Sequence, residues 1–264
     1  MANIKDIQCF LLDMDGTIYL GEELIDGAFD FIQLLKEQDK SFVFLTNNSS
    51  KNSLNYKEKL ERLGIEVSQD LIFTSGTATK LYLLNKNKNS KIFLLGTREL
   101  EIEFEEAGFQ LVRDGDADID YVVLGFDTTL TYDKMWKACD YIRKGIPYIA
   151  THPDFNCPLA HGKMMPDIGA MINFIEGSTN KRPYIIGKPN KEIIDVMQKK
   201  YGFDRDKVAM VGDRLYTDIQ TGINANISTV LVLSGETKIE DYNDSNISAE
   251  YIYESIKELK KAIE

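Results

Sequence analysis

Short, largely apolar runs recur along the chain, and the segments between them have apolar residues at helical spacing. The runs lie at 9–12, 42–45, 92–95, 121–124, 148–150, 184–186, 208–211 and 229–232. Because polar residues do not alternate with apolar ones inside the runs, the pattern is typical of parallel strands buried on both faces. Helical spacing occurs at 28–36, 56–63, 100–107, 133–143 and 255–263, and again after Lys188. The pattern therefore predicts an α/β protein with a doubly wound parallel sheet.

Two stretches of small residues divide this pattern. Residues 73–79 and 176–180 are rich in glycine, serine and threonine, and we interpret both as hinges around an inserted unit that can move as a lid. The expected domains are the first part of a core at 1–79, an inserted cap at 80–178, and the second part of the core at 179–264.

A proline-rich loop is predicted at 151–168. It contains both histidines, His152 and His161, together with Asp154 and Cys157. Cysteine and histidine together suggest zinc, but their spacing here matches no paired ligands of a zinc site. A long loop of this kind more often covers a site, and we expect it to belong to the lid.

Composition excludes several classes of function. The 264 residues carry a formal net charge of −11, which argues against a nucleic-acid partner. The three cysteines are widely spaced, so no disulfide framework is expected. No run approaches the roughly 20 apolar residues of a membrane span, and the first apolar run is too short for a signal peptide. We expect a cytoplasmic protein that contacts neither nucleic acid nor a membrane.

Two carboxylates follow the first apolar run. Asp13 comes directly after this run, and Asp15 follows two positions later. The carboxyl ends of strands are where open α/β sheets place their chemistry. Gly16 allows the chain to turn, so that both carboxylates can face one pocket. The alternative is an ordinary turn stabilised by an aspartate side chain.

Three further runs also end in polar residues. Thr46 and Asn47 open a stretch of five small hydrogen-bonding residues, which can cap the following helix or cradle a phosphate group. Lys188 follows the run at 184–186, and Asp213 follows the run at 208–211, with Asp218 five positions later. We expect these side chains to meet at one edge of the core sheet.

Four carboxylates at one edge would repel each other unless a cation lay among them. Oxygen ligands of this kind suit Mg²⁺, which binds few carboxylates and also contacts substrate phosphate. A carboxylate nucleophile, Mg²⁺, a lysine and a hydroxyl together indicate phosphoryl transfer through an aspartyl-phosphate.

The motifs D-M-D-G-T, T-N-N-S, G-K-P and G-D-R-x-x-x-D resemble those of the haloacid dehalogenase-like phosphatases. Within this superfamily the chain is most similar to the NagD and p-nitrophenylphosphatase branch. The resemblance spans the whole chain and implies a Rossmann-like core with an α/β cap inserted between the second and third motifs. At 152–154 and 166–169 the chain departs from the family pattern, which often has Asn-Pro-Asp and Pro-Gly-x-Gly.

The resemblance also implies roles for individual residues. Asp13 is the expected nucleophile and Asp15 the general acid and base. The other roles are phosphoryl binding by Thr46, Asn47 and Lys188, and Mg²⁺ binding by Asp13, Asp213 and the backbone carbonyl of Asp15, with Asp218 in support.

Three classes of protein use this chemistry. One of them, a signalling receiver module, needs neither an acid and base nor a lid, so Asp15 and the inserted unit argue against it. A hydrolase needs an acid and base such as Asp15 to protonate the leaving alcohol and activate water, whereas a phosphotransferase or mutase uses the same residues but excludes water. We expect the hydrolase, acting on a small-molecule phosphate ester such as a sugar phosphate or p-nitrophenyl phosphate. A homodimer is the assembly that we consider.

Overall fold

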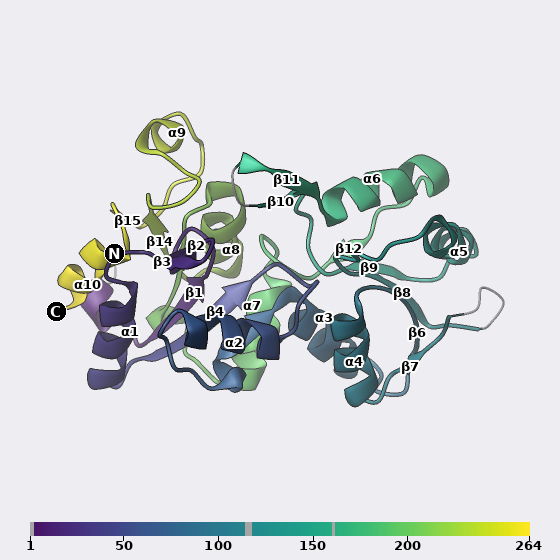
Figure 1. Cartoon of the computed structure of the whole chain (residues 1–264), viewed down its shortest axis with the longest axis horizontal. Coiled ribbons are helices and arrows are strands. Elements are labelled where there is room, and N and C mark those ends of the chain that lie inside the picture. Colours follow the sequence, from purple (N-terminus) through teal and green to yellow (C-terminus); the bar gives the residue numbers. More distant parts are fainter. Residues whose placement is uncertain (1–2, 114–117, 160–161) are drawn as a thin grey trace. The chain divides into compact units, whose positions relative to one another are not determined.

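The computed structural model describes residues 3–113, 118–159 and 162–264. The chain forms two compact units, which are described separately below. Unit 1 comprises 1–46, 53–73 and 188–264, and unit 2 comprises 47–52 and 74–187. Unit 2 is thus inserted into unit 1 along the chain, with a first segment of six residues (Figure 1).

Six strands form the sheet of unit 1 within the described residues, in the order β15-β14-β13-β1-β4-β5. Pairing is parallel from β15 through to β4. Their bounds are β1 Cys9–Asp13, β4 Ser41–Thr46, β5 Ile72–Thr74, β13 Val208–Gly212, β14 Ser228–Val232 and β15 Tyr251–Tyr253. A small antiparallel pair, β2 Tyr19–Leu20 and β3 Glu23–Leu24, follows β1.

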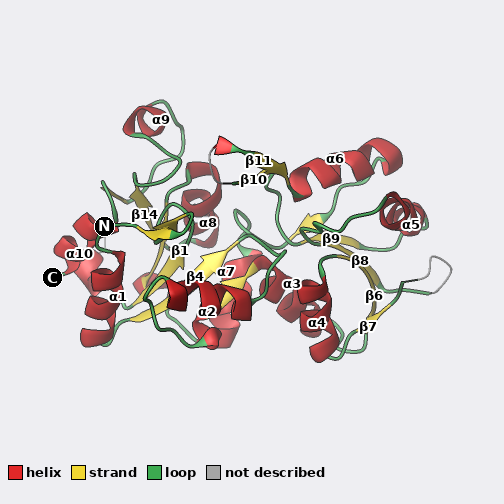
Figure 2. Ribbon diagram, viewed as in Figure 1, coloured by secondary structure: helices red, strands yellow, loops and turns green. Residues whose placement is uncertain are grey.

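Helices cover this sheet (Figure 2). The α-helices of unit 1 are α1 Ala28–Glu37, α2 Ser53–Arg62, α7 Glu192–Tyr201, α8 Gln220–Ala225, α9 Ile239–Asn243 and α10 Ile256–Ile263. Short helical turns lie at η1 Ile4–Asp6, η2 Gln69–Leu71, η4 Arg205–Lys207 and η5 Leu215–Ile219, of which η5 is a π-helix. Alternate residues of β1, β4, β13 and β14 pack with α1, α2 and α10 in one apolar core. The run at 9–12 is buried at every position, which confirms the prediction that the central strands are covered on both faces.

The strand order defines where a site can form. From β1 the chain first builds outward through β4 and later returns to the other side of β1 with β13. The order therefore reverses between β1 and β13, and open α/β sheets bind ligands at the carboxyl ends of the strands at such a switch point. Asp13 and Asp213 stand at the ends of these two strands.

Unit 2 contains a second parallel sheet, with the order β12-β9-β8-β6-β7. Its strands are β6 Lys91–Leu95, β7 Gln110–Leu111, β8 Tyr121–Leu124, β9 Tyr148–Ala150 and β12 Tyr184–Ile185. Its helices are α3 Ser75–Leu84, α4 Arg98–Glu106, α5 Tyr132–Arg143 and α6 Ile168–Thr179. Apolar side chains of α5 and α6 pack on β6, β8 and β9 to form a core separate from that of unit 1.

One sequence-based strand assignment was wrong, while the two expected hinges remain predictions. The run at 184–186 was expected in the core sheet, but β12 pairs with β9 in unit 2. The stretch 73–79, expected as a hinge, ends β5 and begins α3, and 176–180 lies mostly in α6. The small residues of 74–79 are buried, and Thr79 Oγ1 donates to the carbonyl of Ser75 inside α3. The unit boundaries fall at 46/47, 52/53, 73/74 and 187/188.

The proline-rich segment is more regular than a loop. It contains an antiparallel hairpin, β10 Asn156–Pro158 with β11 Met164–Pro166. His161 lies outside the described residues. None of the described helices combines the length and the apolar character that crossing a membrane requires.

Candidate active site

Three carboxylates meet at the switch point of unit 1. Asp13 ends β1, Asp213 follows β13, and Asp218 lies in η5. One oxygen from each lies within 4.8 Å of the others, and among the described residues this is the one group of such side chains that could hold a metal ion. The sequence prediction that these residues meet is thereby confirmed for the three side chains.

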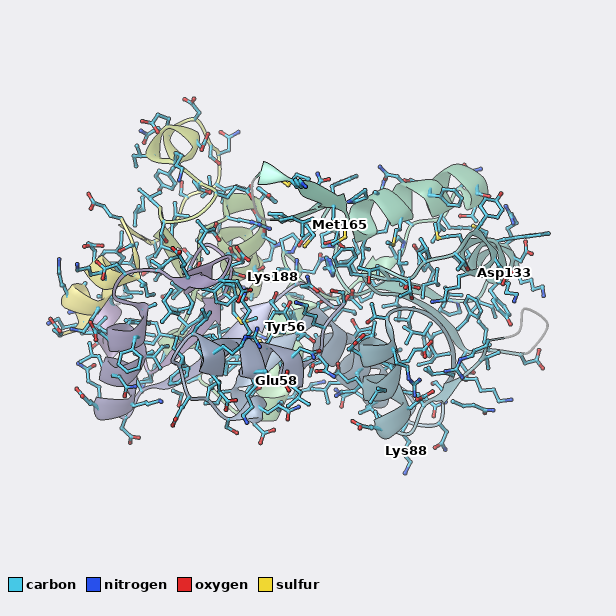
Figure 3. All side chains as sticks on the ribbon, in the orientation of Figure 1. Tyr56, Glu58, Lys88, Asp133, Met165 and Lys188 are labelled. Carbon is cyan, nitrogen blue, oxygen red and sulfur yellow. The ribbon has the colours of Figure 1, made fainter. Side chains whose placement is uncertain are left out.

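Lys188 lies between two of these carboxylates (Lys188 is labelled in Figure 3). Its Nζ is 2.5 Å from Oδ1 of Asp13 and 2.6 Å from Oδ1 of Asp218. The lysine is only 2% exposed. Although the strand before Lys188 belongs to the other sheet, its ammonium group therefore reaches the switch point as the sequence predicted.

Burial and crowding change the proton affinities of these groups. Burial raises the pKa of Asp13 well above its usual range, Asp218 and Asp213 add to the shift, and Lys188 opposes it. Burial and the charge of Asp218 raise the pKa of Asp213 to about 7. Burial alone would lower the pKa of Lys188, but Asp13 and Asp218 raise it above the usual value, so the lysine stays charged.

The cluster fits a divalent cation. Oδ1 of Asp213 is buried and has no hydrogen-bond partner among the described residues, while its Oδ2 accepts the amide of Glu236 at 2.6 Å. A buried carboxylate oxygen without a partner is costly, and a bound cation would remove that cost. The group has oxygen donors and neither histidine nor cysteine, which suits Mg²⁺ better than zinc.

The Asp15 carboxylate does not belong to this group of three. Its side chain is exposed, yet partial desolvation raises its pKa, while Lys59 and Arg214 act in the opposite direction. Lys59 Nζ lies 3.8 Å from the centre of the Tyr19 ring. Asp15 thus stands beside the cluster as a group whose proton affinity differs from that of an ordinary surface aspartate.

Sequence reasoning missed the segment 234–237, which follows β14. Ser234 Oγ donates to the carbonyl of Gly16 at 2.8 Å, and the amides of Glu236 and Thr237 donate to Asp213. Glu236 also pairs with Arg214 at 2.9 Å. The only sequence signal was another strand that ended in small polar residues, which is typical of any turn.

The two remaining predicted residues lie at the carboxyl end of β4, where Thr46 is its last residue and Asn47 follows it. Asp13 is paired with Leu45 in the parallel register, so Thr46 lies one position beyond Asp13 at the same edge of the sheet. Asn47 begins the first segment of unit 2, where its Nδ2 donates to both carboxylate oxygens of Asp154 at 3.2 Å. One sequence interpretation made the stretch 46–50 the cap of the following helix. That interpretation was wrong, because helix α2 starts only at Ser53.

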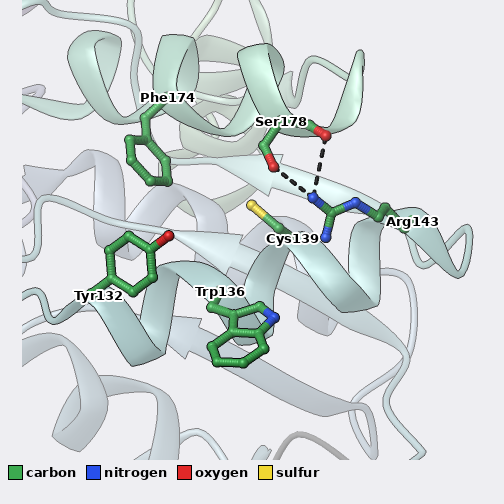
Figure 4. Close-up of a pocket in the computed structure, with 6 residues that line it drawn as sticks. All are labelled: Tyr132, Trp136, Cys139, Arg143, Phe174 and Ser178. Atoms are coloured by element: carbon green, nitrogen blue, oxygen red, sulfur yellow. Dashed lines mark hydrogen bonds between the residues drawn. The ribbon is translucent and has the colours of Figure 1, made fainter.

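A groove between α5 and α6 offers different chemistry (Figure 4). It has a volume of about 280 Å³ and is lined by Tyr132, Trp136, Cys139, Arg143, Phe174 and Ser178. Arg143 donates to the backbone carbonyl and the hydroxyl of Ser178. The lining contains no carboxylate, so this groove lacks the nucleophile and the metal ligands that the switch point provides.

Comparisons with known proteins agree with this geometry. Residues 10–110 match the family model of haloacid dehalogenase-like hydrolases, and 185–259 match a second model, described as HAD-hydrolase-like. The chain is 36% identical over 260 residues to the acid sugar phosphatase of Staphylococcus aureus, which covers 98% of both chains.

Solved structures of phosphatases have the same fold. The 4-nitrophenylphosphatase of Thermotoga maritima superposes with a TM-score of 0.95 at 45% identity over 100% of both chains. A structure assigned to a NagD protein superposes with a TM-score of 0.91 at 43% identity over 99% of both chains. The chain therefore belongs to the haloacid dehalogenase-like hydrolase family, as a phosphatase of the NagD and p-nitrophenylphosphatase type.

Proposed function

We propose that this enzyme hydrolyses small phosphate monoesters through a phosphorylated Asp13, with Mg²⁺ as its cofactor. The observation that carries the proposal is the position of Lys188, whose Nζ contacts Asp13 at 2.5 Å and Asp218 at 2.6 Å inside the carboxylate cluster. A buried cation beside a strand-end carboxylate is suited to a reaction in which a phosphoryl group joins that carboxylate.

In the first step an oxygen of Asp13 attacks phosphorus, and the bond to the leaving alcohol breaks. Asp15 gives its proton to the departing oxygen, and the upward direction of its pKa shift supports this role because it favours the protonated form. In the second step Asp15 takes a proton from water, which attacks the phosphorus and releases inorganic phosphate and free Asp13.

Lys188, Thr46 and Asn47 have positioning and charge-stabilising roles in this proposal. Lys188 would neutralise oxygens of the phosphoryl group as a point charge. The hydroxyl of Thr46 and the amide of Asn47 would bind the same group. These roles follow the family resemblance and the location of Thr46 one position beyond the residue that pairs with Asp13.

Asp13, Asp213 and the backbone carbonyl of Asp15 would hold Mg²⁺, with Asp218 in support. Bound there, Mg²⁺ would reduce the repulsion between the carboxylates and offset charge on the transferred phosphate. The ligand role of Asp213 is supported by its buried Oδ1, which has no hydrogen-bond partner among the described residues.

The substrate class follows from the relatives. A sugar phosphate is supported by the acid sugar phosphatase, and p-nitrophenyl phosphate by the 4-nitrophenylphosphatase. We assign the choice between such substrates to unit 2, in the role of the cap that the resemblance implies.

The test is phosphate release from 4-nitrophenyl phosphate and a panel of sugar phosphates, with and without EDTA. We expect EDTA to abolish turnover and Mg²⁺ to restore it, with Zn²⁺ a poor substitute. An Asp213→Asn variant should need more Mg²⁺ for half-maximal activity. Full turnover in metal-free buffer would exclude the metal, and transfer to an added alcohol without phosphate release would indicate a phosphotransferase.

A further inference from the structure

A chain of buried polar side chains surrounds the first segment of unit 2, residues 47–52. Its members come from separate elements: the segment itself, the start of α3, the end of β9 and the residue before α6. All are nine-tenths or more buried: Asn47, Ser49, Ser75, Thr151, His152 and Asp167. A buried polar network is costly unless each of its members has a hydrogen-bond partner. This requirement allows the donor and the acceptor of each hydrogen bond to be assigned.

The carboxylate of Asp167 determines which atoms donate and which accept along this row of hydrogen bonds. Nε2 of His152 lies 3.1 Å from Oδ1 of Asp167, and a carboxylate only accepts, so Nε2 carries a proton. In the neutral ring Nδ1 is then an acceptor, and Thr151 Oγ1 at 3.1 Å can donate to it. This assignment follows from the network, as hydrogen positions generally do.

The remaining members continue in the same direction. Thr151 Oγ1 lies 2.9 Å from Ser49 Oγ, which can donate to it. Ser49 Oγ in turn accepts the backbone amide of Phe126 at 2.9 Å. The hydroxyls of Ser49 and Thr151 thus each donate once and accept once. His152 connects these two hydroxyls to the carboxylate of Asp167.

His152 also contacts the group that holds the backbone of Asn47. Ser75 Oγ donates to the carbonyl oxygen of Asn47, and Nδ1 of His152 lies 3.3 Å from the same hydroxyl. Two positions after the histidine, both carboxylate oxygens of Asp154 lie 3.2 Å from Nδ2 of Asn47 and accept from it. The backbone and the side chain of Asn47 are therefore both fixed by the segment 151–154 and its contacts.

We infer that His152 is a positioning residue for Asn47, holding this phosphate-binding amide in place through its hydrogen bond to Thr151, which continues to Ser49, and by packing against the hydroxyl of Ser75. The inference rests on the proposed function, in which Asn47 binds the phosphoryl group. His152 has no exposed surface, so it does not contact a substrate. This chain has His152 where the family pattern often has asparagine. We therefore assign this difference to the positioning of Asn47 and not to the choice of substrate.

This role predicts a particular kinetic signature. The phosphoryl group is common to all substrates, so loss of its positioning lowers kcat/KM by a similar factor for every leaving alcohol. A residue that selects the alcohol would change the ranking of substrates instead. A residue needed only for folding would lower the melting temperature and leave the kinetics of the folded enzyme unchanged.

The experiment uses the full-length enzyme and four variants in the network: His152→Leu, His152→Asn, Ser75→Ala and Asn47→Ala. For each we would measure kcat and KM with 4-nitrophenyl phosphate and two sugar phosphates, and the inhibition constant of inorganic phosphate. Glu103→Gln is the matched control, because Glu103 is also a buried acceptor in unit 2, bonded to Thr77 and Lys80, with no assigned bond to 47–52.

We expect His152→Leu and Ser75→Ala to lose roughly 10- to 100-fold in kcat/KM, uniformly across substrates, since small displacements of a positioning group cost about this much. The inhibition constant of phosphate should rise in parallel. His152→Asn should retain most of the activity, because its side-chain oxygen can accept from Thr151 where Nδ1 does. Glu103→Gln should behave like the parent enzyme.

The outcomes separate the two levels of the proposal. If Asn47→Ala is fully active, the phosphate-binding role of Asn47 is wrong, and the inference fails with it. If Asn47→Ala is impaired but Ser75→Ala and His152→Leu bind phosphate normally, the inference alone is wrong. A changed substrate ranking in His152→Leu would also overturn it. Should His152→Leu fail to fold, Thr151→Val, which removes the single hydroxyl that donates to His152, decides the matter.

Discussion

Nζ of Lys188 lies 2.5 Å from Oδ1 of Asp13, although 175 positions separate the two residues along the chain. The strand that precedes Lys188 belongs to the sheet of unit 2, whereas Asp13 ends the central strand of unit 1. The lysine side chain therefore enters a carboxylate cluster built on a different sheet from its own strand. This lysine brings a buried positive charge to the carboxylates of Asp13 and Asp218.

Removing the cation from this pair should destabilise unit 1. In Lys188→Met the carboxylates of Asp13 and Asp218 remain buried without their positive partner, and breaking a buried pair in this way typically costs about 3–5 kcal/mol. We expect a loss of that order in the free energy of unfolding, measured with urea in the presence of EDTA. Activity should fall by at least about 10²-fold, as for removal of a transition-state charge stabiliser.

An exposed ion pair of unit 1 provides the control. Lys257 contacts Asp26 at 2.7 Å, but both side chains are exposed to solvent, so Lys257→Met should leave the free energy of unfolding almost unchanged. Adding Asp218→Asn to Lys188→Met should recover part of the stability, because one of the unpaired charges disappears. Equal losses for Lys188→Met and Lys257→Met would contradict this account.

The segment after β14 should be intolerant of even one methyl group. A Cβ placed on Gly235 would lie 2.0 Å from Oδ2 of Asp213, whereas a Cβ on Gly177, in α6, meets nothing within 4 Å. Gly235→Ala should therefore displace the Asp213 carboxylate and raise the Mg²⁺ concentration for half-maximal activity. Gly177→Ala should leave Mg²⁺ activation unchanged and stabilise the helix by roughly 0.5–1 kcal/mol. Unaltered Mg²⁺ titrations of both variants would show that 234–237 does not support the metal site.

Much of the core could be read from the sequence because its strands are buried on both faces. The bounds of β1, β4 and β13 lie close to the predicted runs, and each carries its polar residues at the carboxyl end as expected. Parallel order places those ends at one edge, so the meeting of Asp13 with Asp213 needed no information on loops.

Other features depend on tertiary contacts that leave no periodic signal. The two-residue strand β12 could join either sheet, and only its register with β9 assigns it to unit 2. Ser75 and Thr79 resembled hinge residues, but they are buried in α3 with their hydroxyls bonded to backbone carbonyls. The roles of Ser234 and Glu236 come from contacts with Gly16 and Asp213 at distant positions in the chain, which no local pattern reports.

The stability of the metal-free enzyme should decrease as the pH rises toward neutrality. Burial raises the pKa of Asp213 to about 7, above the roughly 3.9 of an unfolded chain. The folded state therefore binds more protons between these values, and its advantage is lost as the pH passes through 7. We expect a higher melting temperature near pH 5 than near pH 8 in EDTA, with a smaller difference in Asp213→Asn.

Mg²⁺ should reverse this dependence. The cation binds the deprotonated carboxylate, so its stabilising effect on the melting temperature should be largest above pH 7 and should fall as protons compete below it. A Mg²⁺-induced shift that is independent of pH from 5 to 8 would show that Asp213 does not titrate at the binding site.

The division of labour between Asp13 and Asp15 can be tested with substrates of different leaving groups. Asp13→Asn removes the nucleophile, so no phosphoenzyme should form and activity should be lost almost completely. Asp15→Asn keeps the nucleophile and all three carboxylates of the cluster. It should lose about 10²–10⁴-fold with sugar phosphates, the usual value of general acid–base catalysis. The loss should be smaller with 4-nitrophenyl phosphate, because the departing nitrophenolate needs little protonation.

Water must still be activated in the second step, so Asp15→Asn should accumulate phosphoenzyme when it turns over 4-nitrophenyl phosphate. Rapid-quench labelling measures this species directly, and Asp13→Asn is the negative control for the labelled residue. Label trapped on Asp13→Asn would mean that another side chain is the nucleophile. Equal defects of Asp15→Asn with good and poor leaving groups would show that Asp15 does not protonate the departing oxygen, and the partial desolvation that raises its pKa would then need a different explanation.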